Sequence, residues 1–201
     1  MKNVLGILLV LIAAAVGFVA SRPSQFHVAR SISVAAPASS VFSKVDDFHE
    51  WAAWSPWQHL DPAMKTSFSG AESGAGAVYQ WSGNDKVGEG RMTITSSQPD
   101  QEVAIKLEFI KPFQATNSCT FTLEPEGEAT KVTWAMDGTN NFIAKAMCIF
   151  MSMDKMVGGD FERGLGSLKQ LTESAVQTPA EGEARGAAGA ADAGSKSPAA
   201  H

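Results

Sequence analysis

The sequence is poor in the residues that build catalytic or metal sites. Charged residues make up 18% of the 201-residue chain, below the share of about a quarter usual in soluble domains. The four histidines lack the close spacing of paired metal ligands, and the Gly-x-Ser-x-Gly pattern of a hydrolase nucleophile is missing. No run of Lys and Arg occurs, and the formal net charge is −5. We therefore predict no metal site, no cofactor and no nucleic-acid partner.

Cysteine is almost absent as well. The chain has Cys119 and Cys148, and neither belongs to a Cys-x-x-Cys motif. We interpret both as unpaired apolar thiols, the usual state of isolated cysteines. A disulfide between them stays open as an alternative if the domain is exported, because oxidising compartments permit bridging.

One long hydrophobic run is present, at the N-terminus. Residues 1–21 form a hydrophobic leader, in which Val4 to Ala20 are apolar without interruption. As a helix this run would extend about 25 Å, near the minimum for crossing a bilayer core. We favour a single-pass signal anchor with the domain outside the cytoplasm, because the run exceeds the hydrophobic region of a typical signal peptide. Cleavage near Ala20-Ser21, which would release a secreted or periplasmic domain, is the alternative.

The remainder divides into one domain and a tail. Residues 26–174 have the size of a single domain with a sizeable core. Residues 175–201 are rich in Ala and Gly and nearly free of large apolar side chains. Such a segment cannot bury enough surface to offset its ordering entropy, so we predict a disordered tail.

Hydrophobic periodicity predicts the secondary structure of the domain. Residues 26–34 alternate as a half-buried strand, with Arg30 as an exception on the apolar face. A short helix follows Pro37, and a second around 48–54 stops at Ser55-Pro56. Six further strands are expected at 65–68, 77–81, 88–95, 103–109, 115–124 and 132–136. Apolar residues at helical spacing then predict a long helix in two parts, 142–157 and 160–174, bent at Gly158-Gly159.

Four motifs carry a resemblance to a known family. They are WAAWSPW at 51–57, DPAM at 61–64, GAGAVYQWSGN at 74–84 and GEGRMTI at 88–94. Together with the order of elements, they resemble the polyketide cyclase/dehydrase-like branch of the START/SRPBCC superfamily, over residues 26–173. The resemblance implies an α+β helix-grip fold. In it a curved seven-stranded antiparallel sheet wraps on a long C-terminal helix, with two short helices after the first strand. The N-terminal hydrophobic helix would lie outside this domain.

The resemblance also implies a cavity, since many members bind lipids or other hydrophobic molecules between sheet and helix. Aromatic and methionine side chains are suited to an adaptable apolar wall, although the same residues could equally fill an ordinary core. The candidate cavity residues are Trp54, Trp57, Tyr79, Trp81, Met92, Leu107, Phe109, Phe121, Trp134, Met147, Phe150 and Met151. No catalytic residue is predicted, because no catalytic motif is visible.

Three functions remain open. We favour a membrane-tethered domain that binds a lipid or other hydrophobic small molecule. A cyclase- or hydratase-type enzyme on a hydrophobic substrate is the first alternative, and a polar, titratable side chain in the cavity would favour it. A scaffold or cochaperone-like domain is the second, and a filled interior would select it.

Overall fold

Seven strands form one antiparallel sheet in the order β1-β7-β6-β5-β4-β3-β2. The computed structural model describes residues 2–58, 60–149 and 151–192, and only the backbone for residue 2 and residues 178–192. The strands are β1 (Gln25–Val34), β2 (Lys65–Gly70), β3 (Ala77–Ser82), β4 (Glu89–Gln98), β5 (Glu102–Lys111), β6 (Ala115–Glu126) and β7 (Ala129–Thr139). Each strand from β2 to β6 pairs with the next along the chain, and β1 pairs with β7. The predicted antiparallel sheet is confirmed.

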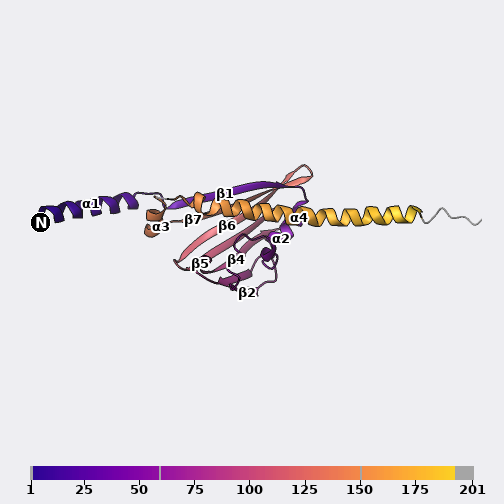
Figure 1. Cartoon of the computed structure of the whole chain (residues 1–201), viewed down its shortest axis with the longest axis horizontal. Coiled ribbons are helices and arrows are strands. Elements are labelled where there is room, and N and C mark those ends of the chain that lie inside the picture. Colours follow the sequence, from indigo (N-terminus) through magenta and orange to yellow (C-terminus); the bar gives the residue numbers. More distant parts are fainter. Residues whose placement is uncertain (1, 59, 150, 193–201) are drawn as a thin grey trace, which may run out of the picture.

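The helices lie before, within and after the run of strands. They are α1 (Lys2–Ala20), α2 (Ala38–Val45), the 3₁₀ helix η1 (Glu50–Ala53), α3 (Phe142–Met147) and α4 (Met153–Asp192). Figure 1 shows α1 extending away from one end of the sheet, while α4 runs beside β1 and projects past the other end. The predicted helix-grip order is confirmed, and so is the position of the hydrophobic helix outside the domain.

The alternation of side chains decides which face of the sheet is covered. In β6 the side chains of Cys119, Phe121 and Leu123 are buried, because every second residue of a strand points to the same face. The buried side chains of α4 include Phe161 and Leu165, one helical turn apart and therefore on one stripe of the helix. This stripe packs on the inner face of the sheet and closes the core.

Polar contacts hold α4 along β1. Lys169 Nζ donates a hydrogen bond to the carbonyl of Ser33 over 2.6 Å. The backbone N–H of Ala35 donates to Glu173 over 2.6 Å, which holds the pKa of that carboxyl below its usual range. Arg30 pairs with Asp154 at 2.7 Å and with Glu162 at 2.6 Å. The helix is therefore fixed over one edge of the sheet.

The predicted helix bend at Gly158-Gly159 is wrong, and the packing of Arg30 explains the first of these glycines. Helix α4 runs through both glycines, and the break lies earlier, between Met147 and Met153. A Cβ on Gly158 would overlap the guanidinium of Arg30. A glycine is needed at 158 because the guanidinium of Arg30 packs against the helix there. Its two carboxylate partners, Asp154 and Glu162, lie one helical turn before and after this glycine.

The two glycines should respond differently to alanine. Gly159→Ala is expected to raise the free energy of unfolding by about 1 kcal/mol, the helix-propensity gain, because a Cβ there meets only Arg163, at 3.6 Å. Gly158→Ala should gain nothing or lose stability, because it displaces Arg30. Urea unfolding followed by circular dichroism measures both, and equal stabilisation by the two variants would contradict the packing described.

The C-terminal end of α4 extends past the predicted domain. Its backbone continues as helix to Asp192, into the segment 175–201 predicted to be disordered. Residues 193–201 lie outside the described part of the chain, and the domain boundary near residue 174 stays a prediction.

Candidate ligand-binding cavity

A cavity of about 410 Å³ lies between the inner face of the sheet and the segment 48–64. This volume is within the range of small-molecule sites, roughly 300–1,000 Å³. The sheet side is formed by Thr66, Phe68, Tyr79, Trp81, Met92, Leu107, Phe109, Cys119, Trp134 and Met136. The opposite wall is formed by Phe48, His49, Trp51, Ala52, Ser55, Trp57, Gln58 and Met64, with Lys86 and Val87 at one side. Helix α4 contributes only Phe161, so the segment 48–64, rather than the helix, covers the cavity.

Trp134 is the centre of the aromatic wall. Its ring stacks on Phe161 with centroids 4.2 Å apart and planes within 5°, and on Phe121 at 4.8 Å. Trp54 and Trp57 meet the same ring edge-on at 5.7 Å and 5.6 Å. Such stacked and edge-to-face contacts add stability beyond the burial of area. They make one end of the cavity rigid.

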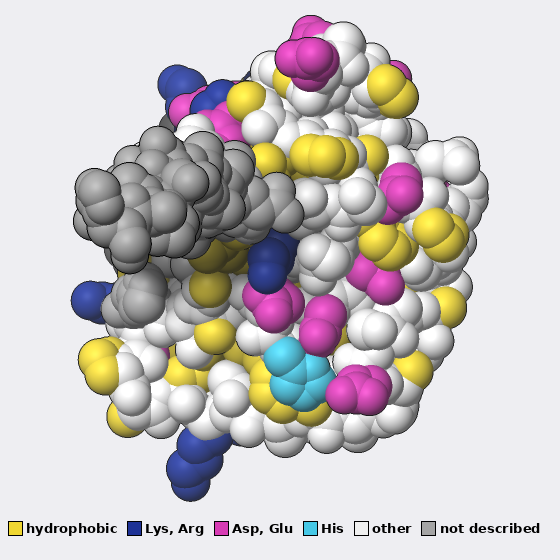
Figure 2. All heavy atoms as spheres, turned by 90° about the vertical axis from the view of Figure 1, so that its right-hand side faces the viewer, with side chains coloured by type: hydrophobic (Ala, Val, Ile, Leu, Met, Phe, Trp, Pro, Cys, Tyr) yellow, Lys and Arg dark blue, Asp and Glu magenta, His cyan; other side chains and the backbone are white. Residues whose placement is uncertain are grey.

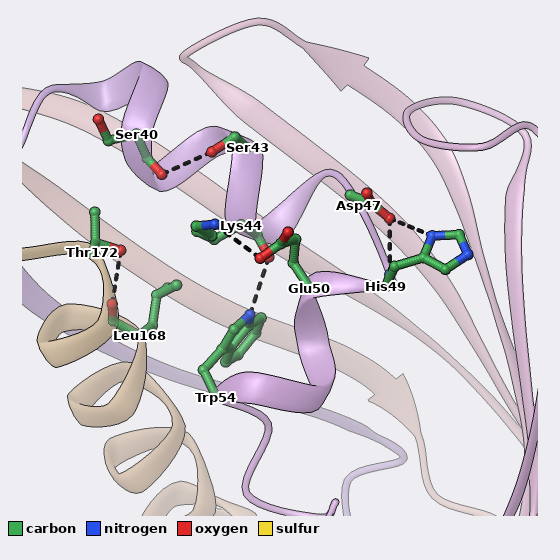
Figure 3. Close-up of polar contacts among 9 residues, drawn as sticks. All are labelled: Ser40, Ser43, Lys44, Asp47, His49, Glu50, Trp54, Leu168 and Thr172. Carbon is green, nitrogen blue, oxygen red and sulfur yellow. Dashed lines mark hydrogen bonds and ion pairs between the residues drawn. The ribbon is translucent and has the colours of Figure 1, made fainter. Parts of the chain in front are cut away.

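Two tryptophan N–H groups hold η1 over the cavity. Trp51 Nε1 donates to the carbonyl of Val45 and Trp54 Nε1 to the carbonyl of Lys44, each over 3.1 Å. Both acceptors lie at the C-terminal end of α2, where the last helical carbonyls lack helical partners. Figure 3 shows the second bond, beside the ion pair of Lys44 with Glu50. The tryptophan spacing thus docks η1 against α2.

At the other end of the cavity, Trp81 closes the wall. Its Nε1 donates to the carbonyl of Val87 over 2.9 Å. Its ring lies over Gly90, where a Cβ would overlap the ring. Gly90, the second glycine of GEGRMTI, is therefore required for the close approach of the Trp81 ring to the neighbouring strand.

Few polar side chains reach the cavity, and His49 and Tyr79 are the titratable ones of chemical interest. His49 stacks on Phe68 at 4.1 Å, and its Nδ1 lies 2.7 Å from Asp47 Oδ1 (Figure 3). Tyr79 contacts the same Phe68 at 5.4 Å. Burial raises the pKa of the Tyr79 hydroxyl, so it stays protonated and can donate a hydrogen bond at neutral pH.

The structure places eleven of the twelve predicted cavity residues, in three groups. The residues that line the cavity are Trp57, Tyr79, Trp81, Met92, Leu107, Phe109 and Trp134. Trp54 and Phe121 are buried in the aromatic cluster and are not among the lining residues. Met147 and Met151 are exposed, at 49% and 50%. The helix is interrupted between α3 and α4, and this interruption places both side chains away from the sheet. Phe150 lies outside the described residues.

Some residues that line the cavity were not predicted, although the hydrophobic periodicity of the sequence indicates the inner face for several of them. Cys119 and Met136 each lie two positions from a predicted candidate on the same strand, so period-2 alternation places them on the inner face. Phe161 belongs to the apolar stripe of α4. Apart from the predicted Trp57, the lining residues between His49 and Met64 carry no such signal, because η1 and the following turns have no regular period.

The two cysteines are both free in the structure and should react differently. Burial raises the pKa of the Cys119 thiol to about 12, so at pH 8 it stays protonated, and only the thiolate is nucleophilic. Cys148 is partly exposed. We expect a maleimide to modify Cys148 in the folded chain and Cys119 only after denaturation. Mass mapping of the labelled peptides checks this, and modification of Cys119 first would contradict it.

The described residues include no metal site, and the face in Figure 2 has no basic surface. Among the described residues, no group of three His, Cys, Asp or Glu could hold a metal ion. On the face in Figure 2, acidic and basic side chains are scattered among apolar ones and form no basic patch.

These features define a class of protein. An antiparallel seven-stranded sheet packed on a long C-terminal helix, with short helices after the first strand, is the helix-grip fold of the SRPBCC superfamily. A family model described as "Polyketide cyclase / dehydrase and lipid transport" matches residues 25–173. The chain belongs to this family.

Solved structures agree on the fold. The Zhui aromatase/cyclase from Streptomyces sp. R1128 is 17% identical, with a TM-score of 0.56, and the match covers 76% of this chain and 96% of that one. A protein from Nitrosospira multiformis is 20% identical, with a TM-score of 0.53, and the match covers 76% of this chain and 99% of that one. Aha1 from Colwellia psychrerythraea is 16% identical, with a TM-score of 0.52, and the match covers 74% of this chain and 96% of that one. The comparison with curated proteins finds no significant match.

Proposed function

We propose that this chain is a membrane-tethered domain that binds a lipid or other hydrophobic small molecule in the cavity. The observation that carries the proposal is the cavity itself, about 410 Å³ in volume and lined mainly by aromatic and aliphatic side chains. Ligand affinity would come from desolvating an apolar body against this wall. The polar side chains of His49, Gln58 and Lys86 would then orient one end of the ligand.

Helix α1 supports the tether. Asn3–Ala20 has a mean hydropathy of 2.6 and is 0% buried, so the described residues leave the apolar surface of this helix uncovered. A retained anchor would satisfy it with lipid. We place the domain outside the cytoplasm, with cleavage near Ala20-Ser21 as the alternative. Intact mass of the membrane fraction distinguishes a retained leader from a cleaved one.

The binding proposal is tested on residues 22–201, purified without detergent. The solved relatives are covered almost completely by this domain, which indicates that it folds without α1. We expect native mass spectrometry to show co-purifying lipid, and a fluorescent fatty acyl probe to bind saturably with energy transfer from the cavity tryptophans. A domain that retains no lipid and takes up no probe would refute the proposal.

A cyclase- or hydratase-type enzyme on a hydrophobic substrate is the second candidate, and the Tyr79 hydroxyl with the His49–Asp47 pair favours it. A histidine oriented by a carboxylate can act as a general base, and a neutral tyrosine can donate to a developing oxyanion. If this candidate is correct, Tyr79→Phe will abolish turnover while leaving uptake of an apolar probe unchanged. Loss of probe binding together with turnover would assign Tyr79 to binding alone.

A further inference from the structure

Exposed apolar side chains gather at one end of the sheet. They belong to α3, to the residues that lead into α4, and to the β5–β6 hairpin, and each is between 40% and 55% exposed. This apolar end surface consists of Ile110, Phe113, Phe142, Ile143, Met147, Ile149, Met151 and Met156. Single exposed apolar residues are ordinary, but a group of them indicates a binding surface.

Strand pairing places these segments at the same end as α1. Gln25, which follows α1, pairs with Thr139 at the end of β7, just before α3. Asn117, just after the β5–β6 hairpin, pairs with Gly138. Lys145 Nζ of α3 donates to the carbonyl of Ala20, the last residue of α1, over 3.3 Å. Figure 1 shows α1 and α3 side by side at this end.

Basic side chains flank the same surface. Arg22 follows α1, Lys145 lies in α3, and Lys155 is exposed in the first turn of α4. Within the described part of the chain, none of the three forms a salt bridge. Apolar side chains bordered by Lys and Arg that form no salt bridge are typical of segments that lie in the headgroup region of a bilayer.

We propose that the apolar end surface docks on the bilayer that α1 spans, with its apolar side chains in the headgroup region and its basic side chains on anionic lipid. The proposal rests on the tether proposed above. A bilayer suits the site better than a second copy of the chain, because the surface begins where α1 ends. An inserted α1 would hold that point at the membrane surface.

Docking would bring one wall of the cavity close to lipid. A Cβ on Gly88 would overlap the backbone carbonyl of Lys111, so the turn that contains Lys86 and Val87 abuts the β5–β6 hairpin. Both of these residues line the cavity. An apolar ligand could then pass between bilayer and cavity with little exposure to water.

The test uses the full chain in vesicles of phosphatidylcholine and phosphatidylglycerol that carry a doxyl-lipid quencher. A fluorophore on Cys148, beside the surface, reports contact with lipid. The control carries the label at Glu128→Cys in a Cys148→Ser background, because Glu128 lies in the β6–β7 turn at the opposite end of these strands. We expect quenching at Cys148 to exceed that at the control several-fold.

Charge on the surface should undo the contact. Phe142→Glu with Ile143→Glu is expected to reduce Cys148 quenching to the control level. Val176→Glu, an exposed apolar position on α4 outside the surface, should leave quenching unchanged. Equal quenching in all three proteins would overturn the proposal.

Three further outcomes show whether the tether, the docking or both fail. If alkaline carbonate washes the chain from the vesicles, both the tether and the docking fail. If the chain is retained but the Cys148 label reports water, the docking alone fails. If the label is shielded from the quencher and cross-linking yields dimers through α3, a second copy covers the surface, and the docking is likewise overturned.

Discussion

Trp134→Ala is expected to lower the free energy of unfolding by about 3–5 kcal/mol, the range for removing a large core aromatic. The side chain is only 2% exposed and stacks on Phe121 and Phe161 from two different elements. Its removal leaves a void between β6 and α4 that neither can fill without moving. Denaturant unfolding followed by far-ultraviolet circular dichroism measures the loss.

Trp134→Phe is the matched control. The Nε1 of Trp134 is buried without a hydrogen-bond partner in the structure, so phenylalanine removes an unsatisfied donor while keeping a ring in the stack. We expect it to cost less than half as much as alanine. A loss below about 1 kcal/mol for the alanine variant would show that the stack does not hold α4 to the sheet.

Met92→Glu is expected to weaken binding of an uncharged fatty acyl probe by at least about tenfold, equivalent to about 1.4 kcal/mol. Met92 lines the cavity and pairs with Leu107 on the neighbouring strand. A carboxylate there would keep water in the apolar space and oppose the desolvation on which binding depends. Titration of the purified domain with the probe measures the change in affinity.

Thr93→Glu serves as the control, because the next residue of a strand points to the opposite face. Thr93 is paired with Lys106, outside the cavity lining, and a glutamate there adds the same charge without entering the cavity. We expect unchanged affinity in this variant. If both variants bind the probe as well as the unsubstituted domain, the ligand lies elsewhere.

The sheet side of the cavity could be predicted from the sequence. Tyr79, Trp81 and Leu107 lie on strands whose alternation is visible in the residues, and a backbone period of two assigns each to the inner face. The opposite wall could not be predicted in the same way. His49 and Gln58 lie in η1 and the turns after it, where no period relates one residue to the next.

On the helical side, the structure places two of the candidate residues away from the cavity. Met147 and Met151 share one face of the helix predicted over 142–157, and a continuous helix there would bring them over the sheet. The structure separates α3 from α4, and this break carries both methionines to the end of the domain. The same residues then contribute to the surface proposed to meet the bilayer.

The sequence by itself determined the strands, their order and the face that each one buries, because these depend on a backbone period that operates over a few residues. Only the tertiary structure decided where the empty space lies. The position of α4 depends on Arg30, which contacts Asp154 and Glu162 across 124 and 132 residues of chain. Because these long-range contacts draw the helix to one edge of the sheet, the rest of the inner face is left to the segment 48–64 and to whatever fills the cavity beneath it.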